Sequence, residues 1–237
     1  MPEPGTEQYV AWVASMIDHS LVRPELTVDQ VREGCELALA HQVASVFVRP
    51  SDVPLAARML VGGPVTLGTV AGFPHGSSST AAKVAEVSRA LAEGAGEIDM
   101  VLNIGLLRSG ADAEVGADIE AVVRAAGPAP VKVILENAYL DDAQKVRGCQ
   151  LAEAAGAAFV KTSTGFAPGG ATLADVRLMR RSVSPAVAVK AAGGVRTLPL
   201  LLEYVAAGAI RFGATATSSI LAAAAGATPT VEPPAGY

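Results

Sequence analysis

Short runs of β-branched and other apolar residues alternate along the chain with longer segments whose apolar positions recur at helical spacing. The short runs predict eight strands, near Ser15–Asp18, Ser45–Val48, Val65–Val70, Glu97–Leu102, Val131–Glu136, Ala158–Thr162, Ala186–Ala191 and Ile210–Gly213. The longer segments predict helices that include Glu7–Ser15, Val28–His41, Ser79–Glu93, Asp112–Ala126, Asp141–Ala155, Leu173–Ser182 and Leu198–Ala207.

This alternation predicts an α/β fold, because parallel strands need long connections and these are usually helices. Eight strand–helix units in 237 residues favour a (β/α)8 TIM barrel over an open sheet, with the helix at Glu7–Ser15 as an extra N-terminal element. Since no Pro- or Ser-rich linker divides the chain, residues 1–237 are predicted to form a single domain. The Pro- and Gly-rich tail, residues 228–237, is expected to be mobile.

Charge and composition argue against several classes of function. The formal net charge is −5 and the basic residues form no cluster, so nucleic acid is not an expected partner. The most apolar tract, residues 220–227, is too short to cross a bilayer, and the N-terminus lacks the pattern of a signal peptide. Cys35 and Cys149 lack metal or redox spacing. We therefore expect a cytoplasmic protein with reduced thiols, no membrane partner and no metal site.

Three of the five lysines lie within predicted strands, namely Lys132, Lys161 and Lys190. An ammonium group inside a barrel must be paired or neutral. One interpretation makes each lysine an ion-pair partner, as Lys132 would be with Glu136 or Asp99. The other is catalytic, because a neutral lysine attacks an aldehyde to form an imine, and burial or a nearby cation lowers its pKa. Lys161 as nucleophile, Lys190 as second cation and Asp99 for proton transfer make up such a set.

Glycine-rich turns follow predicted strands seven and eight and open the next helices. They contain Gly193-Gly194 and Gly213-Ala214-Thr215. Backbone N–H groups at helix starts bind phosphate, and barrel enzymes often bind phosphate at these two loops. The pattern predicts a phosphorylated substrate, with Arg196 either as an added charge or as a solvated helix start. His19 suits a general base or an orienting or core hydrogen bond, and His75 suits a substrate contact or a plain loop.

Six segments, in order along almost the whole chain, resemble the deoxyribose-phosphate aldolases, a family of class I Schiff-base aldolases. They are Ile17–Leu21, Thr69–Gly76, Glu97–Gly105, Phe159–Phe166, Val189–Arg196 and Arg211–Ala214. The resemblance implies that Lys161 forms the Schiff base, Lys190 keeps Lys161 unprotonated and Asp99 relays protons. It also implies substrate-pocket roles for Asp18, Ser20, Thr162 and Tyr237, and phosphate-binding roles for Gly165, Gly193, Gly194, Gly213 and Thr215.

Four positions qualify this resemblance. Ser20 replaces the family's usual Thr but keeps the hydroxyl, and Arg49 stands where a neutral residue is common. Ala216 stands where a phosphate-side Ser is common, which is expected to weaken one hydrogen bond to phosphate. Some members have a C-terminal Tyr that assists proton exchange. Tyr237 is compatible with that role or with an incidental position on the tail.

The reaction that the resemblance implies is the reversible cleavage of 2-deoxy-D-ribose 5-phosphate to D-glyceraldehyde 3-phosphate and acetaldehyde, as in deoxyribonucleotide catabolism, without a metal or organic cofactor. Two alternatives stay open: a Schiff-base aldolase for another phosphosugar, and a non-catalytic phosphosugar-binding barrel. The latter would not need Lys161, Lys190 and Asp99 together. The expected partners are small phosphosugar and aldehyde substrates. Family members form dimers or tetramers, so we expect a homo-oligomer, with a dimer favoured.

Overall fold

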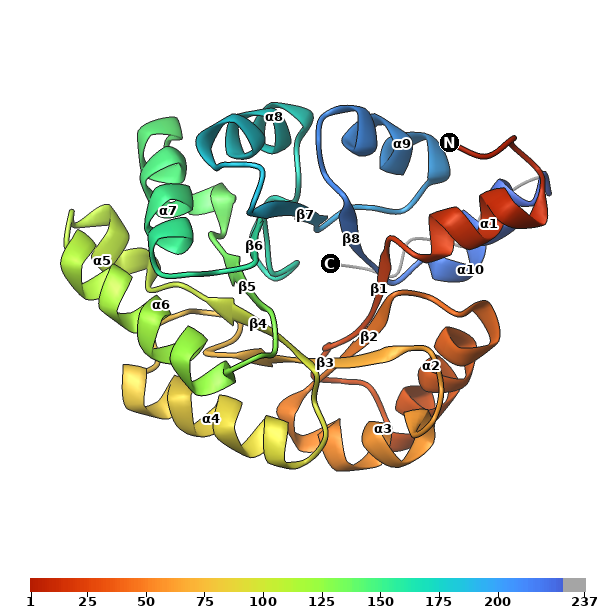
Figure 1. Cartoon of the computed structure of the whole chain (residues 1–237), viewed down its shortest axis with the longest axis horizontal. Helices are drawn as coiled ribbons and strands as arrows, with labels where there is room; N and C mark the ends of the chain where they lie inside the picture. The colour runs from red at the N-terminus through yellow and green to blue at the C-terminus, as the bar shows by residue number, and fades with distance from the viewer. Residues whose placement is uncertain (228–237) are drawn as a thin grey trace.

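The computed structural model describes residues 1–227 of the 237-residue chain. Eight parallel strands close into a barrel in chain order, with β8 pairing back to β1, and helices surround it (Figure 1). The strands are β1 Ile17–Leu21, β2 Ser45–Val48, β3 Thr66–Ala71, β4 Glu97–Val101, β5 Val131–Ile134, β6 Phe159–Lys161, β7 Ala188–Ala192 and β8 Arg211–Ala214. The predicted TIM barrel is confirmed.

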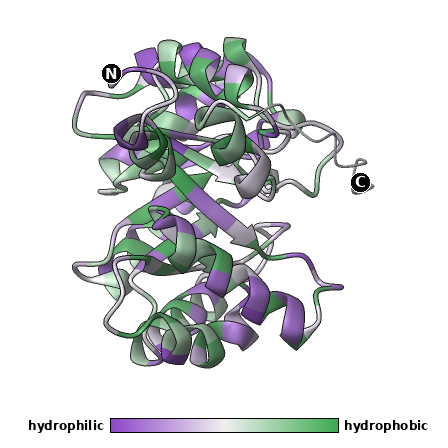
Figure 2. Cartoon of the chain, turned by 90° about the vertical axis from the view of Figure 1, so that its right-hand side faces the viewer, coloured by the Kyte–Doolittle hydropathy of each residue, from purple (hydrophilic) through white to green (hydrophobic). Residues whose placement is uncertain are grey.

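The helices follow the strands, except for α1, which precedes β1 and packs against α10. Their bounds are α1 Glu7–Ala14, α2 Val28–His41, α3 Val53–Leu60, α4 Thr80–Ala92, α5 Ile104–Arg108, α6 Asp112–Ala126, α7 Asp142–Ala154, α8 Leu173–Ser182, α9 Leu198–Ala206 and α10 Thr217–Ala224. Two 3-10 turns, η1 Pro50–Asp52 and η2 Asn137–Tyr139, follow β2 and β5. Apolar and polar residues alternate along the helices in Figure 2. Within residues 1–227, no helix combines the length and apolarity needed to cross a membrane.

Many of these helices have an N-cap residue whose side-chain oxygen accepts a backbone hydrogen bond. At seven helices the capping residue accepts a hydrogen bond from the backbone N–H three residues on, which satisfies one of the free donors of the first turn. These caps are Thr6, Thr27, Ser79, Asn103, Asp141, Thr172 and Thr197. The sequence therefore sets where many of the strand-to-helix loops end, and these loops carry the rim of the barrel.

The strands separate an apolar layer from a charged interior. In β4, Ile98 and Met100 belong to the hydrophobic core, whereas Glu97 and Asp99 contact charged side chains of other strands inside the barrel. The register places Asp99 beside Lys132. Barrel interiors are usually filled by branched apolar residues, so this charged interior departs from the common pattern.

Several predicted bounds are corrected. The first strand was expected at Ser15–Asp18, but α1 ends at Ala14 and β1 runs from Ile17 to Leu21. Asp18 and Ser20 of β1 line the interior cavity, and these polar residues hide the strand from a search for apolar runs. Helices α3 and α5 were not predicted, because α3 has only 8 residues with a Pro at its second position, and α5 has only 5 residues.

Outside the barrel, a buried ion pair joins two neighbouring helices. Lys83 of α4 is fully buried, and its Nζ lies 2.6 Å from Asp118 Oδ2 of α6. The Thr80 hydroxyl donates to the other carboxylate oxygen of Asp118 at 2.8 Å. This lysine is therefore a structural ion-pair partner, and the catalytic interpretation does not extend to it.

Candidate active site

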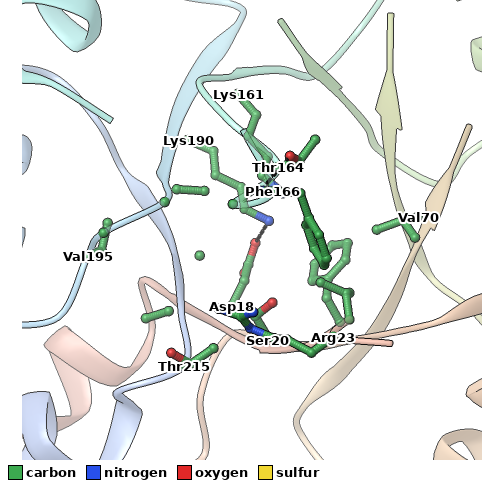
Figure 3. A pocket seen from close by; sticks show the side chains of 18 of the residues that line it. Asp18, Ser20, Arg23, Val70, Lys161, Thr164, Phe166, Lys190, Val195 and Thr215 are labelled. Atoms are coloured by element: carbon green, nitrogen blue, oxygen red, sulfur yellow. Dashed lines mark hydrogen bonds and ion pairs between the residues drawn. The ribbon is translucent and has the colours of Figure 1, made fainter. Parts of the chain in front are cut away.

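A cavity opens at the carboxyl ends of the strands, where barrel enzymes carry their active sites (Figure 3). Side chains and loops from most strands contribute to its wall. The lining residues are Asp18, Ser20, Val22, Arg23, Phe47, Val70, Phe73, Lys161, Thr164, Gly165, Phe166, Lys190, Ala192, Gly193, Gly194, Val195, Arg196, Gly213, Ala214 and Thr215.

Lys161 and Lys190 lie side by side in the register of β6 and β7 and share one carboxylate oxygen. Each ammonium donates to Asp99 Oδ2 at 2.7 Å. Lys190 Nζ also lies 2.6 Å from Asp18 Oδ2, the contact drawn across the cavity in Figure 3. The three residues predicted to be catalytic are thus brought together, with Asp18 as a fourth member.

A second layer of charge lies against this group. Lys132 contacts Glu97 and lies 3.5 Å from Asp99 Oδ1 and 3.7 Å from Asp18 Oδ2. Arg211 donates to Asp18 Oδ1 at 2.9 Å and to Glu97 Oε1 at 2.8 Å. Lys132 is an ion-pair partner, as one interpretation held, but its closest partner is Glu97 and not Glu136.

The charges of these seven residues do not balance if all are ionised. The cluster holds the carboxylates of Asp18, Glu97 and Asp99, and the cations Lys132, Lys190, Arg211 and Lys161. With three carboxylates against four cations, one cation has no counter-charge within the cluster. Losing one proton would restore neutrality, and the cost of buried charge favours this.

Lys161 is the cation that loses its proton most readily. Burial and then repulsion by Lys190 lower the pKa of Lys161 to about 8, although Asp99 and Asp18 oppose this. Burial also disfavours charge on Lys190, but Asp18 and Asp99 outweigh burial and raise its pKa. Burial opposes ionisation of Asp99 as well, yet Lys161, Lys190 and Lys132 hold its pKa far below the usual range. Lys161 is therefore the lysine closest to neutrality near pH 7.

An aromatic ring lies against Lys132 and Lys190. The ring centroid of Phe47 lies 4.1 Å from Lys190 Nζ and 4.5 Å from Lys132 Nζ, distances at which a ring face attracts a cation. Gly68 is paired with Phe47 in the sheet, and a Cβ at Gly68 would stand 2.4 Å from the ring. The glycine in β3 therefore makes room for this ring. Sequence reasoning did not single out Phe47.

The residues predicted to bind phosphate lie on the loops and strand ends of three neighbouring strands, β6, β7 and β8. Gly165, Gly193, Gly194, Gly213 and Thr215 all line it, and so do Arg23 and Arg196. Gly193 and Gly194 have φ angles of +85° and +82°, which favour glycine. The cavity that holds Lys161 and Lys190 is thus also lined by glycine-rich loops, whose backbone N–H groups could bind phosphate, and by two arginines.

The other predicted site residues do not all reach the cavity. Ser20 lines the cavity, but Thr162 does not, because its hydroxyl donates to the Ala192 carbonyl and accepts from the Ala192 N–H. His75 is exposed and does not line the cavity. Tyr237 lies outside the described residues, so its predicted role stays a prediction.

The two remaining positions of interest have structural partners. The ring of His19 faces Thr217 of α10, with Nδ1 2.8 Å from Oγ1, and burial lowers its pKa to about 4. Arg49 donates to Asp52 at 2.6 Å and to the carbonyls of Arg23 and Pro24, so it ties the β1–α2 loop to η1. Of the two interpretations of His19, the hydrogen bond agrees with the structural one.

Sequence reasoning also missed residues that define the site. Glu97 and Arg211 complete the buried ion network, and Phe73 and Phe166 meet edge to face at the rim with ring centroids 5.3 Å apart. The signal for Glu97 was present, because it lies two residues before Asp99 and shares the same strand face. Within residues 1–227, no group of three His, Cys, Asp or Glu side chains could hold a metal ion.

The chain is similar in sequence to known aldolases. The model of the DeoC/LacD family aldolases matches residues 12–227. Deoxyribose-phosphate aldolase 2 of Bacillus licheniformis is 48% identical over 215 residues, which cover 90% of this chain and 96% of that protein. The deoxyribose-phosphate aldolase of Staphylococcus epidermidis is 49% identical over 208 residues, which cover 88% and 94%.

Solved structures of aldolases have the same fold. QR15, an aldolase, is similar with a TM-score of 0.85 at 34% identity, over 88% of this chain and 94% of that one. The tetrameric deoxyribose phosphate aldolase of Aeropyrum pernix is similar with a TM-score of 0.83 at 27% identity, over 91% and 97%.

Proposed function

The chain belongs to the DeoC/LacD family of aldolases, and we propose that Lys161 is the nucleophile with which it cleaves 2-deoxy-D-ribose 5-phosphate. The chain is a lyase, a deoxyribose-phosphate aldolase like its curated relatives. The observation that carries the assignment of Lys161 is the surplus of one cation in the buried cluster. A lysine with a pKa of about 8 is partly neutral near pH 7 and can attack a carbonyl carbon.

The cleavage begins when the neutral Lys161 amine attacks the aldehyde carbon of the open-chain sugar. Loss of water from the resulting carbinolamine gives an iminium ion, and Asp99, 2.7 Å from Lys161 Nζ, is placed to exchange protons there. The bond between carbons two and three then breaks, and its electron pair forms the enamine while the carbon-three hydroxyl loses its proton. D-Glyceraldehyde 3-phosphate leaves, the enamine is protonated, and hydrolysis of the imine releases acetaldehyde and free Lys161.

Lys190 assists these reaction steps as a fixed positive charge. Its ion pairs with Asp18 and Asp99 keep it protonated, so it repels a proton on Lys161 throughout the cycle. The phosphate of the substrate would lie against Gly165, Gly193, Gly194, Gly213 and Thr215, where backbone donors and Arg196 meet. All of these groups belong to the chain, so we expect activity to survive dialysis against a chelator.

The test is trapping of the imine. Borohydride added to the enzyme with acetaldehyde should reduce the imine to a stable ethyl adduct on Lys161, found by peptide mass spectrometry. Lys161→Arg should give no adduct and no turnover. An adduct on another lysine, or full activity in Lys161→Arg, would refute the assignment. Turnover of other phosphosugars that matched or exceeded that of deoxyribose 5-phosphate would point to a different substrate.

The wider organisation is also a proposal. We propose a single aldolase domain over residues 1–237 that assembles as a homo-oligomer, with a dimer favoured, whereas the Aeropyrum pernix aldolase is described as a tetramer. The two buried free cysteines, Cys35 and Cys149, agree with a cytoplasmic location. Light scattering of the purified protein would measure the mass of the assembly.

A further inference from the structure

Glu136 has an unusual backbone conformation for its residue type. Its φ is +56°, and Gln42, at +49°, is the only other non-glycine residue among the described ones with a positive φ. Gln42 caps the end of α2, where a left-handed residue is common. Glu136 caps no α-helix end and lies between β5 and η2. A bulky residue in this region is strained and persists only when its surroundings hold it there, often near a functional site.

The side chain of Glu136 holds the loop that follows β6. It is 1% exposed, and both carboxylate oxygens accept from the Thr164 N–H, at 3.3 and 3.2 Å. The Thr164 hydroxyl donates to Glu136 Oε2 and accepts from the Phe166 N–H at 3.0 Å. One carboxylate therefore fixes the backbone on both sides of Gly165.

Backbone hydrogen bonds on either side of Glu136 also hold β6 and the loop that follows it. Leu135 N–H donates to the Lys161 carbonyl at 2.9 Å, and Asn137 N–H donates to the Thr162 carbonyl at 3.0 Å. The residues before and after Glu136 thus hold β6 and the start of its loop in register. The left-handed conformation at Glu136 lets its side chain reach Thr164 while both neighbours keep these hydrogen bonds.

The loop that is held in this way forms part of the cavity wall. Thr164, Gly165 and Phe166 line the cavity, and Glu136 does not. The same cavity is lined by Gly193 and Gly194, so the β6–α8 and β7–α9 loops share the end where we place the substrate phosphate. A phosphate bound by backbone donors requires those donors at fixed positions.

We propose that Glu136 is a positioning residue for the phosphate end of the substrate, acting through Thr164 on the backbone of Gly165. The inference rests on the proposed function, because it needs a phosphate at this end of the cavity. It assigns no contact between Glu136 and substrate. If the loop were loosened, it would bind the phosphate group less well, whereas the reaction of the aldehyde end with Lys161 would be unchanged.

The experiment compares two substrates in three variants. Glu136→Leu removes both acceptors, Thr164→Val removes only the hydroxyl, and Glu136→Gln keeps the shape and one acceptor oxygen. With 2-deoxy-D-ribose 5-phosphate, KM should rise about tenfold or more in Glu136→Leu and by less in Thr164→Val, with kcat within about threefold. With 2-deoxy-D-ribose, which lacks the phosphate, kcat/KM should stay within about threefold in both variants.

Gln42→Leu is the matched control, because it places the same apolar side chain at the other left-handed position, which is exposed. It should leave the kinetic constants for both substrates unchanged. Glu136→Gln should have a KM for the phosphorylated sugar much closer to that of the wild type than Glu136→Leu has. If Glu136→Leu fails to fold, the phosphate-selective effect of Thr164→Val carries the test.

Equal losses on both substrates would overturn the inference, as would a Thr164→Val variant with unchanged KM for the phosphorylated sugar. A wild-type enzyme that cleaves neither sugar would refute the proposed function instead, and this inference with it. A wild-type enzyme that prefers the phosphorylated sugar, with equal losses in the variants, would refute the role of Glu136 alone.

Discussion

Lys190 Nζ donates to Asp99 Oδ2 at 2.7 Å, a hydrogen bond that crosses the barrel interior from β7 to β4. The same oxygen accepts from Lys161, so two ammonium groups compete for one carboxylate oxygen. Asp18 also pairs with Lys190, at 2.6 Å, whereas within residues 1–227 Lys161 has only Asp99 as a salt-bridge partner. This inequality selects Lys161 as the lysine that loses its proton.

Removing the Lys190 charge should make Lys161 a weaker nucleophile near neutral pH. In the wild type, the rate of imine trapping with acetaldehyde and borohydride should rise with pH around a midpoint near the Lys161 pKa of about 8. In Lys190→Met the repulsion is lost and Asp99 Oδ2 is left to Lys161, so the midpoint should move upward by about one pH unit. A midpoint that stays or falls would contradict this electrostatic role for Lys190.

Neutralising Asp99 should shift the same midpoint in the opposite direction. Asp99 raises the pKa of Lys161, so Asp99→Asn should lower the midpoint below that of the wild type. Turnover should nevertheless fall, by about a hundredfold or more, because the group placed for proton transfer is gone. Faster trapping below pH 8 together with slower turnover would separate the two roles of Asp99. Trapping that slowed at every pH would show instead that Asp99 is needed for the attack itself.

The two active-site lysines and Asp99 could be recognised from sequence because each is a charged residue inside a predicted apolar strand. Lys161 and Lys190 stand in otherwise apolar strands, and the even spacing within strands puts such residues on the interior face. The closed barrel then brings those faces together without further information. Fold and catalytic cluster were predictable for the same reason, since both follow from the order of strands and the alternation of side chains.

What sequence could not supply depends on side-chain packing between distant segments. Thr162 lies next to Lys161, yet its hydroxyl turns away to bond the backbone of Ala192. Phe47 reads as an ordinary core residue, and only the closed barrel places its ring against two lysines. Glu136 is the last residue of the fifth predicted strand, but no local pattern predicts its left-handed backbone.

Two neighbouring glycines should tolerate alanine very differently. A Cβ on Gly170 would stand 2.2 Å from the Gly193 carbonyl oxygen, which is backbone and cannot step aside. Gly170→Ala should therefore displace the β7–α9 loop and raise KM for deoxyribose 5-phosphate by about tenfold or more. A Cβ on Gly169 would meet only the Ala138 Cβ at 3.5 Å, an ordinary contact. Gly169→Ala is the matched control, and similar kinetics in the two variants would contradict the role of this close approach.

His19 should make the fold less stable in acid. Burial lowers the pKa of its ring from 6.5 to about 4. At pH values between these two, the ring binds a proton in the unfolded chain but stays neutral in the folded chain. Stability is full above pH 6.5 and falls as the pH drops toward 4, and this gap corresponds to about 3 kcal/mol. His19→Gln removes the titrating ring. The free energy of unfolding, measured by urea titration at each pH, should fall less steeply in this variant than in the wild type between pH 6.5 and 4. Equal slopes would show that other groups control the acid loss.

Lys83 offers a test of buried charge outside the active site. It is fully buried and paired with Asp118 at 2.6 Å, and Lys83→Met would leave that carboxylate without its cation. Breaking a buried pair from one side costs about 3–5 kcal/mol, so the free energy of unfolding should drop by that amount. Adding Asp118→Leu removes the stranded charge, and the double variant should regain most of the loss because apolar replacements of a buried pair are often neutral. The pH midpoint of imine trapping should stay near 8 in both variants, since the pair lies between α4 and α6. A shifted midpoint would mean that this ion pair affects the pKa of Lys161 through the barrel wall. If the double variant is no more stable than Lys83→Met, lost packing and not the unpaired carboxylate causes the loss of stability.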